Sequence, residues 1–195
     1  MTASPLARRA WVLVAFVGSM WLVRVVDTFR DASIAGYGII PRSGHLVGIL
    51  AAPFIHANWA HLIANTLPLL VLGALILLDG TGEFVFVTIV TMLCAGAGTW
   101  LFGSTANHIG ASGVVFGYMG YLLFRPAFDR RLWSVVVTVI VISIYGTTLF
   151  LAITPQAGIS WSGHAFGFLG GLVAARLHKR QASVGDRGGR SVVMP

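Results

Sequence analysis

The sequence predicts an all-α membrane protein with six transmembrane helices. Of its 195 residues, 56% are hydrophobic and only 10% are charged, whereas about 25% of the residues in an ordinary soluble domain carry a charge. Six apolar segments, most of them long enough to cross a hydrocarbon core of about 30 Å, alternate with polar connections. We expect no separate soluble domain in this chain.

The first apolar segment covers residues 11–26 and is expected to remain a span, because no small-x-small cleavage site follows it. Residues 27–57 mix charge, glycine and proline with short apolar pieces, which predicts a structured interfacial loop. The remaining predicted spans are residues 58–78, 84–102, 112–124, 133–153 and 163–178. Together the spans define one six-helix domain over residues 10–178.

The basic residues indicate how the chain crosses the membrane. Six spans place both chain ends on one side, and that side receives ten of the 13 lysines and arginines. The positive-inside rule therefore predicts a cytoplasmic N-terminus, residues 1–9, and a basic, disordered cytoplasmic tail, residues 179–195. This topology also accounts for the net charge of +7, so we expect no nucleic-acid partner. The expected location is a cell membrane, in a bacterium the inner membrane.

The fourth predicted span is short. Residues 112–124 make about 20 Å of helix at about 1.5 Å per residue, less than the thickness of about 30 Å that a full span needs. This helix should therefore start below the membrane surface. Irregular backbone at that depth is tolerated only inside protein or beside water, so residues 103–111 should dip inward and leave Ser112 at the bottom of a cavity.

Two predicted helix faces carry glycines beside chemically active side chains. Gly113 and Gly117 lie one helical turn apart directly after Ser112. A second glycine ladder starts beside His164 and consists of Gly163, Gly167 and Gly171. If the two faces pack together, the Ser112 hydroxyl comes near the His164 imidazole. A hydroxyl next to an imidazole is the minimum requirement for a nucleophilic serine.

The second predicted span begins with two polar side chains on one helix face, His61 and Asn65. Both can donate hydrogen bonds, and neutral donors at this depth suit an oxyanion hole. The alternative is that they tie helices together, a role worth about 1 kcal/mol or less. The sequence leaves both open. His56, five residues before His61 and nearer the surface, is expected to support the network or water access.

Other polar residues receive simpler interpretations. Asp79 and Glu83 are expected in the cytoplasmic turn between the second and third spans, which leaves a Ser-His dyad without a carboxylate. His108 and His178 are expected to be solvated. The histidines lack the paired spacing of a zinc protease, so we expect no metal and no cofactor.

The chain resembles the rhomboid intramembrane serine proteases. The resemblance rests on the pattern His-x4-His-x3-Asn (His56, His61, Asn65), on Gly110-x-Ser112-Gly113, and on Gly163-His164 followed by small residues such as Gly167. With the six-helix frame, these motifs cover residues 10–178. The resemblance implies a six-transmembrane-helix rhomboid-like bundle, a peptide-bond hydrolase that cleaves transmembrane helices of protein substrates near the outer face of the lipid bilayer.

The resemblance also implies roles for individual residues. Ser112 would be the nucleophile, His164 the general base, and His61 and Asn65 the oxyanion donors beside the Ser112 N–H. Phe116 occupies a position where the family often has a tyrosine that stacks on the catalytic histidine. The Trp-Arg pair common in the family's first loop is absent here, and the fifth span would be a lateral gate.

Three other classes share some of these features. An inactive rhomboid-like protein would bind membrane clients without cutting them, but such relatives typically lose the serine or the histidine. A small polytopic transporter would usually show repeat symmetry and substrate-binding charges. A purely structural membrane protein would explain the spans but not the convergence of polar side chains.

Overall fold

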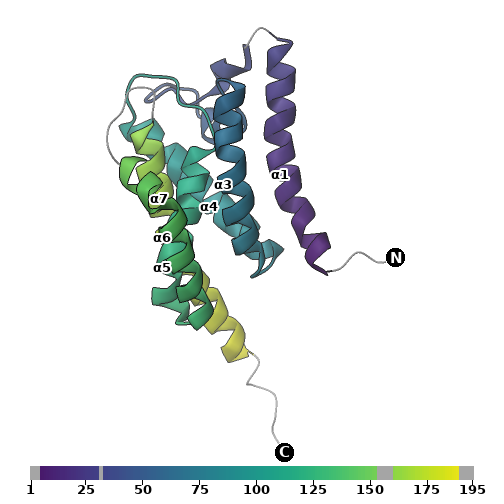
Figure 1. Cartoon of the computed structure of the whole chain (residues 1–195). Helices are drawn as coiled ribbons and strands as arrows, with labels where there is room; N and C mark the ends of the chain where they lie inside the picture. Colours follow the sequence, from purple (N-terminus) through teal and green to yellow (C-terminus); the bar gives the residue numbers. More distant parts are fainter. Residues whose placement is uncertain (1–4, 31–32, 153–159, 189–195) are drawn as a thin grey trace, which may run out of the picture.

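The computed structural model describes residues 5–30, 33–152 and 160–188. Regular structure in these residues is helical, apart from one isolated antiparallel bridge between Ile39 and His108. The elements are α1 (Pro5–Thr28), η1 (Ser33–Tyr37), α2 (Gly48–Ala51), η2 (Ala52–Phe54), α3 (Trp59–Leu77), α4 (Thr81–Phe102), α5 (Ser112–Asp129), α6 (Leu132–Ala152) and α7 (Trp161–Gly188). Each of the predicted spans overlaps one of the long helices (Figure 1).

Four stretches within these helices are long and apolar enough to cross a membrane: Arg9–Thr28, Trp59–Leu77, Thr81–Phe102 and Leu132–Phe150. They belong to α1, α3, α4 and α6. The other two long helices, α5 and α7, pack closely on each other. Besides the glycines at this contact, α5 contains Arg125 and Asp129, and α7 contains Arg176 and His178.

α5 begins at Ser112 as predicted and is the shortest of the six long helices, but the prediction that it ends at residue 124 is wrong. It continues to Asp129, and its 18 residues make about 27 Å of helix at about 1.5 Å per residue. Arg125, the first residue after the expected end, is buried. The guanidinium of Arg125 is bonded to Asp79 and Asp129.

α7 also runs further than its predicted span. It continues to Gly188, into the segment 179–195 that the sequence analysis assigned to a disordered tail. Residues 189–195 lie outside the described part of the chain.

α5 forms the centre of the bundle. Residues 114–122 are all buried, because α5 packs against α3, α4, α6 and α7. A helix surrounded in this way must be apolar or small on every face. Its sequence meets this requirement with glycines toward α7 and large apolar side chains elsewhere.

The two glycine ladders pack together as the sequence analysis predicted. Cβ atoms at Gly167 and Gly171 would collide with the backbone carbonyls of Gly113 and Gly117. A Cβ at Gly117 would in turn lie 3.1 Å from the Gly167 carbonyl oxygen. Small residues let the two backbones approach this closely. The close approach brings the first turns of α5 and α7 to the same level.

We predict that Gly167→Ala destabilises the fold by about 1–3 kcal/mol, the usual cost of overpacking a close contact. The added methyl group would run into the Gly113 carbonyl. A lower thermal unfolding midpoint in detergent would report this loss. Gly18→Ala is the matched control, because nothing lies within 4 Å of its missing Cβ and alanine is the better helix former. Equal midpoints for the two variants would contradict the packing argument.

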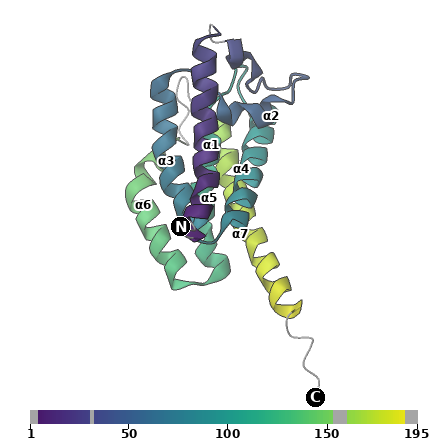
Figure 2. The ribbon, with the colours of Figure 1, turned by 90° about the vertical axis from the view of Figure 1, so that its right-hand side faces the viewer.

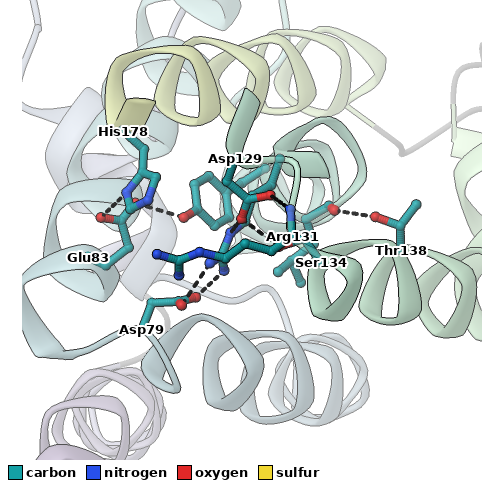
Figure 3. A network of polar contacts seen from close by, with 10 residues as sticks. Asp79, Glu83, Asp129, Arg131, Ser134, Thr138 and His178 are labelled. Atoms are coloured by element: carbon teal, nitrogen blue, oxygen red, sulfur yellow. Dashed lines mark hydrogen bonds and ion pairs between the residues drawn. The ribbon is translucent and has the colours of Figure 1, made fainter. Parts of the chain in front are cut away.

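A charged network holds the end of the bundle where α1 begins and α7 ends (Figures 1 and 3). Arg125 donates to both carboxylate oxygens of Asp79, in the turn between α3 and α4, and to Asp129 at 2.7 Å. Asp129 also accepts the hydroxyl of Ser134 in α6. Arg125 therefore links the α3–α4 turn with the α5–α6 turn.

The same network includes His178, and the expectation that this residue is solvated is wrong. Its Nδ1 lies 2.7 Å from a carboxylate oxygen of Glu83, which also accepts the Tyr121 hydroxyl at 2.8 Å. Figure 3 shows His178 and Glu83 facing each other. The pairing arises because the first turn of α4 brings Glu83 up against α7.

Candidate active site

Only the end of the segment 103–111 is held inside the bundle: residues 104–107 are exposed, whereas residues 108–110 are half-buried and Ala111 is buried. Backbone hydrogen bonds anchor this end. His108 and Ile39 exchange two bonds of 2.9 Å each, and the Gly110 N–H donates to the Ala52 carbonyl at 2.9 Å. Gly110 has a φ of +112°, a conformation that L side chains rarely adopt. These contacts fix the backbone immediately before Ser112.

Ser112 and His164 are brought together at the starts of α5 and α7. The Ser112 Oγ lies 2.9 Å from the His164 Nε2. His164 is buried, and its ring stacks on the ring of Phe116 with a centroid distance of 4.3 Å and an interplanar angle of 26°. A hydroxyl within hydrogen-bond reach of an oriented imidazole is the arrangement of an activated nucleophile.

His61 and Asn65 lie against the backbone that precedes Ser112. The His61 Nε2 is 2.6 Å from the position of the Cβ that Gly110 lacks, and the Asn65 Nδ2 is 3.7 Å from it. α3 starts at this level because Asn58 caps it by accepting the His61 N–H at 2.8 Å. The cap sets the height at which both side chains meet Gly110.

The hydrogen bonds of these two side chains bear on their role. Asn65 donates one amide hydrogen to the His61 carbonyl, four residues back, at 3.1 Å, and its Nδ2 carries a second hydrogen. Within the described residues, neither the His61 nor the Asn65 side chain hydrogen-bonds to another helix. The contacts therefore give no support to the alternative that these residues tie helices together.

His56 lies behind His61, in the segment before α3. Its side chain is 1% exposed, and its ring meets that of His61 edge-on with a centroid distance of 5.0 Å. Burial, with the charge of His61 as a lesser cause, lowers the pKa of His56 to about 4. The neutral imidazole accepts the N–H of Ala111 at 3.4 Å through Nε2. His56 thus contacts the residue directly before Ser112.

A cavity opens beside Ser112, and His108 forms part of its wall. The lining is mostly small and apolar, from residues Ile39, Ile49, Ala52, Pro53, Met92, Ala95, Gly96, Thr99, His108, Ile109, Gly110, Ser112, Gly113, Val114, Ser160 and Gly163. The expectation that His108 is solvated is wrong, since its Nδ1 lies 2.7 Å from the Ser160 Oγ. The same hydroxyl accepts the Gly163 N–H at 3.4 Å, in the first turn of α7.

Two further residues near the site, Arg24 and Asp27, form a buried ion pair to which the sequence analysis assigns no role. Asp27 is 2% exposed and pairs with Arg24 at 3.1 Å. A signal for this pair exists in the sequence, because ionisable residues inside an apolar span are costly and usually have a specific partner or role. Their spacing of three residues places them on one helix face.

Comparisons with known proteins agree with this architecture. The family profile of the Rhomboid domain matches residues 43–181. The uncharacterized protein Rv1337 of Mycobacterium tuberculosis is 38% identical over 191 residues, which cover 90% of this chain and 80% of that protein. The uncharacterized protein ML1171 of Mycobacterium leprae is 39% identical, covering 85% of this chain and 69% of that protein.

A relative with a named activity is more distant. The rhomboid protease GluP of Bacillus subtilis is 30% identical over 130 residues, which cover 65% of this chain and 25% of that protein. The matched residues 43–181 include Ser112, His164, His61 and Asn65. This chain therefore belongs to the rhomboid family.

Proposed function

We propose that this protein is an intramembrane serine endopeptidase in which Ser112 and His164 form the catalytic dyad. The observation that carries the proposal is the 2.9 Å separation between the Ser112 Oγ and the His164 Nε2. Membership of the rhomboid family supports the same class of activity.

The geometry supports a two-step acyl transfer. The His164 Nε2 accepts the hydroxyl proton while the Ser112 Oγ attacks the carbonyl carbon of the scissile peptide bond. The protonated imidazole then gives this proton to the amine nitrogen as the carbon–nitrogen bond breaks, leaving an acyl-serine. Water, deprotonated by the same imidazole, attacks the acyl carbon, and the proton returns to the Ser112 Oγ as the acid product leaves.

The negative charge on the carbonyl oxygen requires donors, and three groups are suitably placed. We assign this role to the side chains of His61 and Asn65 and to the Ser112 backbone N–H. α5 starts without a side-chain cap, so the N–H groups of its first turn are not occupied by one. Fixed donors in a site shielded from water stabilise an oxyanion more strongly than water does.

The proposed substrates are transmembrane helices of other proteins. A helix protects its own peptide bonds by hydrogen bonding, so cleavage is favoured where glycine and other weak helix formers let the segment unwind. The cavity beside Ser112 is lined by small residues such as Ala95, Gly96 and Gly163. We therefore expect a small side chain before the scissile bond.

The proposed entry route lies at α6. This helix packs against α5 at one edge of the bundle (Figure 2), and Val139, Ile142 and Ile144 leave half or more of their surface exposed. In a bilayer those faces meet lipid. We propose six membrane crossings with both termini in the cytoplasm. In this topology Ser112 lies in the outer half of the membrane, and α6 is the lateral gate through which a substrate helix reaches it.

Cleavage in liposomes tests the proposal. The purified protein is reconstituted with a reporter whose single transmembrane helix carries Gly-Ala pairs near its outer end. We expect two product fragments, cut within the membrane-embedded segment. Saturable binding of the reporter without cleavage, under conditions where the protein is folded, would support the inactive client-binding class instead.

We predict that Asn65→Ala lowers turnover by about 10²–10³, the usual loss for one oxyanion donor. The reporter assay measures this loss, with the folded fraction checked by thermal unfolding. Thr66→Ala is the matched control on the same helix: its hydroxyl bonds the Leu62 carbonyl and Trp21, away from the site. If both variants lose stability but neither loses turnover, Asn65 has a structural role only.

A further inference from the structure

The outer end of α1 contains a buried ion pair that the mechanism above does not use. Arg24 and Asp27 leave only 12% and 3% of their side-chain surfaces exposed, and their charged atoms lie 3.1 Å apart. The second carboxylate oxygen of Asp27 accepts the Ile34 N–H at 2.9 Å, at the start of η1. The pair therefore joins α1 to the loop that follows it.

Arg24 also reaches the segment that leads into α3. Its Nη1, besides contacting Asp27, donates to the His56 carbonyl at 3.4 Å. The guanidinium lies over the ring of Trp59, the first residue of α3, 5.5 Å from the ring centroid. A cation over an indole face is held by the quadrupole of the ring. One side chain of α1 thus contacts both ends of the segment 56–59.

His56 carries these contacts into the candidate active site. Its backbone carbonyl receives the Arg24 hydrogen bond, and its Nε2 accepts the Ala111 N–H. Ala111 is fully buried and directly precedes Ser112. A continuous series of contacts therefore runs from Asp27 through Arg24 and His56 to the backbone that presents the nucleophile.

Stability alone does not account for a charged pair in this position. Replacing a buried ion pair with apolar side chains is often neutral or stabilising, because the charges lose their hydration. The Arg24 Nε is buried and has no hydrogen-bond partner among the described residues, which adds to the cost of keeping the guanidinium there. An apolar pair would anchor α1 without that cost, but it would not hold the His56 carbonyl.

We infer that the buried Arg24–Asp27 pair of α1 positions the candidate active site, acting through His56 on the backbone of Ala111 and Ser112. The expected effect on kcat rests on the proposed proteolytic function. The expected effect on the backbone around Ala111 does not. Arg24 and Asp27 are positioning residues, since neither reaches the reacting atoms. α1 then serves as part of the catalytic framework as well as a membrane anchor.

The structural consequence is tested by amide hydrogen exchange in the full-length protein in detergent. Arg24→Gln should speed exchange in peptides that cover residues 109–116, because the Ala111 N–H loses a firmly held acceptor. Asp129→Asn is the matched control. It removes a carboxylate from a buried ion pair of comparable exposure, Arg125–Asp129, at the opposite end of the bundle. Exchange in 109–116 that is unchanged in Arg24→Gln, or equally faster in both variants, would overturn the inference whether or not the protein is a protease.

The catalytic consequence is tested by kinetics on the reporter substrate. We expect Arg24→Gln to lower kcat by about 10-fold to 10²-fold with KM little changed, because small displacements at a reacting centre are costly. Arg24→Lys, which keeps the charge, should recover part of the loss. Asp129→Asn should lower the unfolding midpoint but leave kcat within about twofold of the wild type, as expected for a site away from the chemistry.

A double-mutant cycle shows whether Arg24 acts through His56. In a His56→Ala background, Arg24→Gln should cause little further loss of kcat, since the contact it maintains is already broken. Independent, multiplying losses would refute the route through His56. A wild-type protein that cleaves the reporter, with Arg24→Gln cleaving it equally well, would overturn the inference while leaving the proposed function intact. A wild type that cleaves nothing counts against the proposed function, and the exchange experiment then decides the structural claim.

Discussion

Ser112→Ala is expected to abolish cleavage of a transmembrane reporter, with a loss of roughly 10⁶-fold, the size seen when the nucleophile of a serine protease is removed. The substitution deletes one oxygen, the atom that lies 2.9 Å from the His164 Nε2. Ser112 sits at the start of α5, where no side-chain cap depends on it. The variant should therefore fold and keep its unfolding midpoint while losing turnover.

A fluorophosphonate probe that reacts with activated serines gives a second measurement on the same samples. The wild type should be labelled and Ser112→Ala should not. Ser19→Ala serves as the control, because the Ser19 hydroxyl only bonds the Phe16 carbonyl within α1, so both labelling and turnover should match the wild type. Undiminished turnover in purified Ser112→Ala would exclude Ser112 as the nucleophile.

The approach of Ser112 to His164 was predictable because it follows from helical periodicity. Glycines four residues apart must share a face, and two such faces favour close contact. The register of the contact, with Gly167 against the Gly113 carbonyl, is what the ladders require if the two helices start at the same level. The stacking of Phe116 on His164 follows from the same register, since Phe116 lies one turn after Ser112.

The contacts that the sequence did not reveal join residues far apart in the chain through loop geometry. His108 meets Ser160, and Arg125 meets Asp79, only because helix ends and connections come together at the two ends of the bundle. Periodicity within one helix contains no information about such pairs. For the same reason the predicted end of α5 falls five residues before the observed end. Arg125 is a charged residue inside the helix, and its partner Asp79 lies in the turn between two other helices.

Burial of Asp27 was missed for a related reason. In the sequence this carboxylate stands at the edge of an apolar span and looks like the first residue of a polar loop. Its burial depends on Arg24 one turn earlier and on the Ile34 N–H, which the loop brings back against α1. The available signal was the pair of opposite charges at helical spacing inside a span. The contact with the Ile34 N–H has no signal in the sequence.

His164→Ala is expected to reduce cleavage about as severely as Ser112→Ala, because a serine hydroxyl is a weak nucleophile until a base accepts its proton. The buried imidazole packs against the Phe116 ring, so the alanine variant leaves a void that also lowers stability. His164→Gln, which is closer in size, is therefore measured beside it, with unfolding midpoints for both.

The two losses should not multiply. Residues that act as one unit are strongly non-additive, so the double variant Ser112→Ala/His164→Ala should be no slower than either single variant. His45→Ala is the control for removing a histidine, since His45 is exposed in the loop between η1 and α2, and it should cleave the reporter at the wild-type rate. Serine-dependent cleavage by His164→Gln and His164→Ala at rates close to the wild type would refute the dyad, because the 2.9 Å contact between the two side chains would then have no part in the chemistry.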